Sequence, residues 1–163
     1  MKTLIFHGVV NTGIGKHANL VIPGRNAFPN APPDWPKILQ PGSLNILIDD
    51  NGYPSEFAQL QPNKKVENLD SKQFQPAFTI PYDRMQNNKL KPCTEMPEKG
   101  TAQVWRATLH VKVNAVSHLA WVHRRLGSGI DKQLELVSDI HLRNTLSLKD
   151  GMEIKVELQY EEN

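Results

Sequence analysis

The amino-acid sequence predicts a mainly β protein, a small closed barrel of six to eight short strands. Apolar and polar residues alternate with a period of two in several segments, most clearly over residues 101–113. Glycine and proline turn signals separate these segments, and no repeated strand–helix–strand pattern occurs. A doubly wound nucleotide fold is therefore disfavoured. A closed barrel suits such strands because closure removes the edges of the sheet.

The expected strands follow one another along the chain. They cover residues 3–10, 18–22, 43–49, 101–113, 118–124, 134–138 and 152–160, with 73–80 as a weaker candidate. Successive residues of a strand face opposite sides, so Ser43 and Asn45 point the same way. A short helix is expected over residues 140–146, with Asp139 as its N-cap.

Two segments lack a regular period. Residues 25–40 contain four prolines and are expected to form a loop, which Trp35 anchors on the barrel. Residues 50–100 contain six more prolines and are expected to form a loop-rich insertion that wraps around the barrel. The length of 163 residues suits one domain over residues 1–163.

The composition and net charge indicate which kinds of partner the protein binds. Apolar residues make up 39% of the chain and charged residues 22%, as in a soluble globular protein. The net charge is only +2, so there is no general electrostatic reason to bind nucleic acid or a membrane. We therefore expect small-molecule ligands, with neither nucleic acid nor membrane as a partner.

Cysteine usage and hydropathy bear on the compartment. The single cysteine, Cys93, excludes an internal disulfide and suits a reducing compartment. The early apolar run 4–6 is too short for a signal-peptide core, and no run reaches the roughly 18 apolar residues of a membrane span. These observations predict a cytoplasmic protein. The six histidines show no metal-site spacing, which disfavours zinc.

A glycine-rich segment, residues 8–15, contains the end of the first expected strand and the turn directly after it. Such a turn lets backbone N–H groups approach a phosphate closely. The candidate nucleotide-binding residues are Gly13, Ile14, Gly15, Lys16 and His17. The segment is neither a P-loop nor a dinucleotide fingerprint, because the required lysine or third glycine is missing. The alternative is an ordinary tight turn.

A pair of oxygen ligands is the second candidate. Ser43 and Asn45 share one face of a strand, and side-chain oxygens suit a hard cation such as Mg²⁺. Such an ion keeps water and phosphate oxygens as its remaining ligands. The spacing alone equally describes the polar outward face of a strand.

The third candidate lies in the last third of the chain. Arg124 and Arg125 precede a turn that contains Ser128, and together they could bind a phosphate or carboxylate of the substrate. Glu135 lies among apolar strand residues and could act as a general base on a substrate hydroxyl, which makes it the candidate catalytic residue. The alternatives are a solvated loop and an exposed strand glutamate.

Taken in order, these motifs resemble the archaeal CTP-dependent riboflavin kinases. The matching stretches are residues 8–15, 41–45 (Gly-Thr-Leu-Asn in that family) and 134–156, with its Leu-Lys-Asp-Gly turn. The resemblance implies a six-stranded cradle-loop, riboflavin-kinase-like barrel. It also implies Mg²⁺-assisted, in-line transfer of the CTP γ-phosphoryl group to riboflavin, giving FMN.

The resemblance also implies roles for individual residues. The glycine-rich turn would hold the CTP phosphates, Ser43 and Asn45 would bind Mg²⁺, and Glu135 would orient the attacking hydroxyl of the flavin ribityl chain. The chain departs from the family at His17, where a third glycine is usual, and over residues 50–100, which have no clear counterpart.

Two other functions stay open at this point. One is a non-catalytic nucleotide- or flavin-binding module on the same barrel. The other is an interaction or DNA-binding protein on a similar barrel, which the near-neutral charge disfavours.

Overall fold

The computed structural model describes residues 1–12, 28, 30–40, 44–61, 64–80 and 101–162. The strands of this part are β1 (Lys2–Asn11), β2 (Leu44–Ile48), β3 (Phe78–Ile80), β4 (Ala102–Val111), β5 (Val116–Arg125), β6 (Gln133–Val137) and β7 (Glu153–Tyr160). The helices are the 3-10 turns η2 (Ser55–Gln59) and η3 (Val66–Asp70) and the short α1 (Leu142–Thr145).

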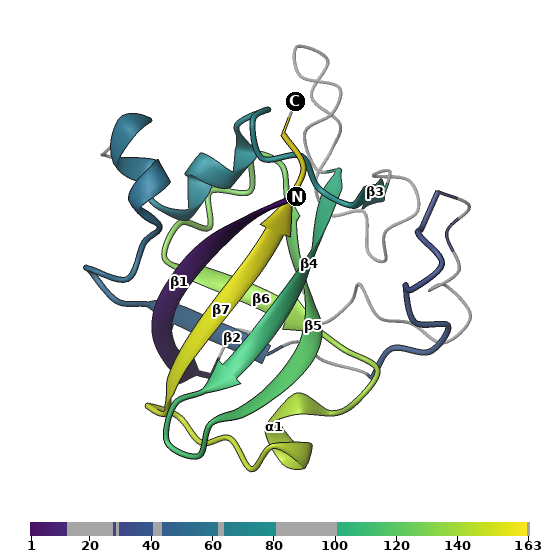
Figure 1. Ribbon diagram of the computed structural model, residues 1–163, viewed down its shortest axis with the longest axis vertical. Coiled ribbons are helices and arrows are strands. Elements are labelled where there is room, and N and C mark those ends of the chain that lie inside the picture. Colours follow the sequence, from purple (N-terminus) through teal and green to yellow (C-terminus); the bar gives the residue numbers. More distant parts are fainter. Residues whose placement is uncertain (13–27, 29, 41–43, 62–63, 81–100, 163) are drawn as a thin grey trace.

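Six strands close into an antiparallel barrel. Neighbouring strands pair in the order β4-β5-β6-β2-β1-β7, and β7 pairs with β4 to complete the ring. The short β3 pairs with the start of β4 and lies outside the ring (Figure 1). The prediction of a mainly β, six-stranded closed barrel is confirmed.

The alternating sequence of β4 shows why these residues form barrel strands. Trp105, Ala107 and Leu109 are buried, whereas Arg106 and Thr108 between them are partly exposed. Val111 of β4 and buried partners from the other strands fill the barrel interior with them: Leu4, Phe6, Val10, Leu44, Ile46, Ile48, Ala120, Val122, Leu134, Leu136, Ile154, Val156 and Leu158. The core is thus made by one face of every barrel strand.

The first part of the expected insertion closes one end of the barrel. Phe57 of η2 packs edge-on against Phe6 with ring centroids 5.6 Å apart, and Phe74 packs against Tyr160 at 5.0 Å. The indole of Trp105 donates a hydrogen bond of 3.1 Å to the Phe74 carbonyl oxygen. This segment therefore belongs to the main core. Residues 81–100 lie outside the described residues.

A second apolar cluster lies on the outer face of the barrel. Trp35 packs edge-on against Trp121 and Phe78, with centroid distances of 5.1 and 4.9 Å. Asp34, next to it, forms a two-point ion pair with Arg106 of β4. The prediction that Trp35 anchors the loop before β2 on the barrel is confirmed.

Some element boundaries differ from the predictions. The helix covers only residues 142–145, and His141, not Asp139, is its N-cap, because its Nδ1 accepts from the Asn144 N–H at 3.2 Å. Only the last three residues of 73–80 form a strand. The expected strand 18–22 lies outside the described residues.

Candidate functional site

Three polar residues lie side by side across β2, β6 and β5. Strand register pairs Asn45 with Glu135, and Glu135 with His123. Directly opposed residues project from the same face of a sheet, with Cβ atoms about 5 Å apart. The residues flanking Glu135 on β6, Leu134 and Leu136, face the barrel core. We call Asn45, Glu135 and His123 the polar row, and it lies on the outer face of the barrel.

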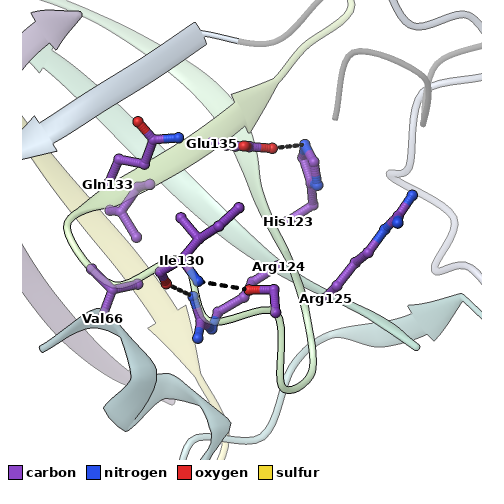
Figure 2. A pocket seen from close by; sticks show the side chains of 9 residues that line it. Val66, His123, Arg124, Arg125, Ile130, Gln133 and Glu135 are labelled. Carbon is purple, nitrogen blue, oxygen red and sulfur yellow. Dashed lines mark hydrogen bonds and ion pairs between the residues drawn. The ribbon is translucent and has the colours of Figure 1, made fainter. Parts of the chain in front are cut away.

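The polar row is buried. The exposed fractions are 8% for Asn45, 7% for Glu135 and 4% for His123. Burying a carboxyl group is costly unless it is paired or neutral. Nε2 of His123 lies 3.4 Å from Oε2 of Glu135, and Figure 2 shows the two side chains pointing toward each other.

Burial changes the acidity of Glu135. It raises the pKa of this carboxyl from 4.5 to about 7, although the charges of Arg125 and Arg124 act in the opposite direction. A carboxyl group with a pKa near neutral pH can take up and release a proton under physiological conditions. Such a group in a concave site is typical of acid–base catalysts.

A small pocket adjoins the polar row. Glu135, His123, Arg125 and Ser128 line it together with Val66, Arg124, Ile130, Gln133 and Leu134. Its volume of about 20 Å³ has room for roughly one water molecule. A hydroxyl group of a larger molecule would fit the same space.

The two arginines of the predicted substrate site have different surroundings. Arg124 is buried, and its guanidinium donates two hydrogen bonds to Asp70 of η3, at 3.0 and 3.2 Å, and another to the Ile130 carbonyl oxygen. It joins the barrel to η3. The side chain of Arg125 lines the pocket and extends away from Arg124 (Figure 2).

Ser128 lies in the turn that follows β5. Its Oγ accepts a hydrogen bond of 3.3 Å from the Ile130 N–H, so the side chain stabilises the turn as well as lining the pocket. Gly127 and Gly129 flank it with φ angles of 70° and 78°. These left-handed conformations favour glycine, which explains the Gly-Ser-Gly sequence of the turn.

The structure brings together part of the predicted site. Asn45 and Glu135 are neighbours in the polar row, and Arg125 and Ser128 share the pocket with Glu135. The remaining predicted residues lie outside the described part of the chain: Gly13, Ile14, Gly15, Lys16, His17 and Ser43.

Thr12 is the last described residue of the glycine-rich segment 8–15. Its Oγ1 donates a hydrogen bond of 2.7 Å to Asp150 in the Leu-Lys-Asp-Gly turn, and Arg143 donates another of 2.7 Å to the same carboxylate. These bonds, that of Thr12 first, lower the pKa of Asp150. The start of the glycine-rich segment is thus held at the end of the barrel where β7 begins.

His123 is the site residue that the sequence analysis missed. The six histidines were considered only as metal ligands, and their spacing gave no metal site. The signal that could have found it is its position two residues after Trp121, which places both side chains on the same face of the strand. Within the described ranges, no group of three or more His, Cys, Asp or Glu side chains could hold a metal ion.

Comparisons with known proteins assign no family. No protein-family model matches the chain, and a search of curated proteins finds no match. In the part of the chain that the structure describes, no helix has the length and apolar character needed to cross a membrane.

Proposed function

We propose that this protein is a nucleotide-dependent kinase that transfers the γ-phosphoryl group of CTP to riboflavin, giving FMN, or to a related small alcohol. The observation that carries the proposal is the pairing of Asn45 with Glu135. These residues come from two motifs far apart in the sequence, one expected to bind a cation and the other to act as a base. Their positions on adjacent strands support a single site for both functions.

Glu135 is the general base in this proposal. As the acceptor oxygen forms its bond to the γ-phosphorus, the hydroxyl proton passes to the Glu135 carboxylate and CDP leaves with the electron pair of the broken P–O bond. The raised pKa of Glu135, about 7, makes it a better proton acceptor than an ordinary glutamate. Positioning and charge neutralisation contribute the rest of the rate enhancement.

The side-chain oxygen of Asn45 suits Mg²⁺, which prefers hard oxygen ligands and retains water and phosphate oxygens. Its neighbour in the polar row is a carboxyl group, so the local donor set is oxygen-rich. Asn45 and Ser43 would hold the ion, which when bound neutralises charge on the phosphates. The turn from Gly13 to His17 would hold those phosphates, and Arg125 and Ser128 would bind the acceptor.

Calorimetric titration with CTP and Mg²⁺ tests the proposal, using wild type, Asn45→Ala and the matched control Asn144→Ala. Asn144 is an exposed asparagine of α1. We expect wild type and Asn144→Ala to bind Mg²⁺–CTP, and Asn45→Ala to bind at least about tenfold more weakly, since one lost ligand costs roughly 1.4 kcal/mol or more.

Titrations with ATP, riboflavin and FMN complete the test. Absence of any nucleotide or flavin binding to wild type, or equal affinities of both asparagine variants, would contradict the proposal. Binding without transfer of phosphate would instead support the non-catalytic module.

A further inference from the structure

We propose that His123 is a positioning residue for this phosphoryl transfer, and that its imidazole holds the Glu135 carboxylate in the orientation in which it accepts the proton. The inference rests on the proposed function. It adds to that function a residue that neither the motifs nor the resemblance assigns.

Strand pairing fixes the relative position of the two residues. His123 of β5 lies directly opposite Glu135 of β6 in the antiparallel ladder. The next opposed pair on the same face is Trp121 and Val137, which are 6% and 1% exposed. Trp121 packs in turn against Trp35. The backbone that carries the pair is therefore held by an apolar cluster on one side.

The contact joins a ring nitrogen of His123 to one carboxyl oxygen of Glu135. Nε2 of His123 and Oε2 of Glu135 are 3.4 Å apart, within ion-pair distance but longer than an ordinary N–H···O hydrogen bond of about 2.7–3.2 Å. Hydrogen bonds of catalytic groups often tighten only when substrate is bound. A glutamate side chain has three rotatable bonds, so a fixed donor beside one carboxylate oxygen limits the directions in which the group can accept a proton.

The neighbouring residue on β5 has a different role. Arg124 projects from the opposite face of the strand and is held by Asp70. His123, in contrast, contacts the side chain of the candidate base itself. We therefore assign the orientation of Glu135 to His123.

The test measures FMN formation from CTP and riboflavin in His123→Leu, which removes the N–H donor but keeps an apolar side chain, and in His123→Gln, whose amide can replace the Nε2–H donor. We expect kcat of His123→Leu to fall on the order of 10²-fold, as for a misplaced catalytic group. The KM values for CTP and for riboflavin should change little. His123→Gln should recover most of the lost kcat.

A double variant separates positioning from a general structural role. If His123 acts through Glu135, His123→Leu should cause no further loss of kcat in a Glu135→Gln background. Additive losses, or unchanged kcat in His123→Leu, would overturn the assignment. His123→Asn, whose amide is too short to reach Glu135, replaces His123→Leu if the latter does not fold.

Failure of the inference can be distinguished from failure of the proposed function. If the wild type forms FMN and His123→Leu has the same kcat, only the role of His123 is overturned. If the wild type binds no nucleotide and forms no phosphorylated flavin, the proposed function and the role of His123 are both overturned.

Discussion

His123 and Arg124 are consecutive residues of β5, and each pairs with a carboxyl group on an opposite face of the strand. On one face, Asp70 accepts four hydrogen bonds, two from Arg124 and one each from Gln103 and the Gly127 N–H, with lengths of 2.9 to 3.3 Å. On the other face, Glu135 has His123 at 3.4 Å, and burial raises the pKa of its carboxyl to about 7.

The difference separates a structural pair from a functional one. A carboxylate that accepts several hydrogen bonds, two of them from one guanidinium, fixes the elements that it joins. A buried carboxyl group whose pKa is raised is poised to exchange a proton. Burial of the basic partners does not distinguish the two pairs, since the side chain of His123 is 3% exposed and that of Arg124 is 5% exposed. The number and charge of the hydrogen-bond donors distinguish them.

The largest expected effect on stability is that of Arg124→Met. This change leaves Asp70 without its guanidinium partner in a largely buried setting, where the side chain of Arg124 is 5% exposed. Removing one partner of a buried ion pair costs about 3–5 kcal/mol, so the free energy of unfolding measured in urea should fall by that amount. A loss below about 1 kcal/mol would show that the pair does not hold the barrel to η3.

The second prediction concerns the pH dependence of stability through Glu135. The folded pKa of about 7 lies above the ordinary value of 4.5, so the folded state binds the proton more tightly. The stability from this group is complete below pH 4.5 and falls as the pH rises to about 7. Glu135→Gln removes this dependence. Its stability relative to wild type should rise by about 3 kcal/mol across that window.

Urea unfolding of both proteins at several pH values checks this prediction. A stability difference that stays constant from pH 4 to pH 8 would mean that Glu135 titrates as an ordinary glutamate (roughly pKa 4.3). That result would contradict the assignment of Glu135 as a general base with a raised pKa.

The smallest effect is expected for Arg106→Met, which serves as the matched control for Arg124→Met. Arg106 also makes a two-point pair with an aspartate, at 2.6 and 2.7 Å to Asp34, and its guanidinium lies 5.3 Å from the Trp121 ring centroid. Its side chain is 34% exposed and that of Asp34 is 54% exposed. Solvent screening should limit the loss to about 1 kcal/mol in the same urea experiment. Equal losses in the two arginine variants would mean that burial does not set the strength of these pairs.

Much of the fold could be predicted because it depends on local patterns. The alternation in β4 and β7 and the glycine turns identified the strands and the closed barrel. The prediction of Asp139 as the helix N-cap was wrong. The position of the first helical turn makes His141 the N-cap, and the local sequence does not determine that position.

The site could be predicted only residue by residue. Asn45 and Glu135 each stood out as polar residues on strands, but their adjacency depends on the register of β2 against β6, which no local pattern reports. His123 could not be predicted for the same reason, because its partner Glu135 lies on the neighbouring strand. Arg124 and Arg125 looked equivalent in sequence, and only the position of Asp70 distinguishes them.

The most direct test of the central claim is FMN formation from CTP, Mg²⁺ and riboflavin by wild type, Glu135→Gln and the control Glu157→Gln. Glu157 is a strand glutamate on β7 whose side chain is 35% exposed and contacts His110 and Lys155. We predict that Glu135→Gln lowers kcat by about 10²- to 10⁴-fold, the usual contribution of a general base, while Glu157→Gln stays close to wild type. Equal turnover by Glu135→Gln and wild type, or no turnover by wild type, would contradict the account.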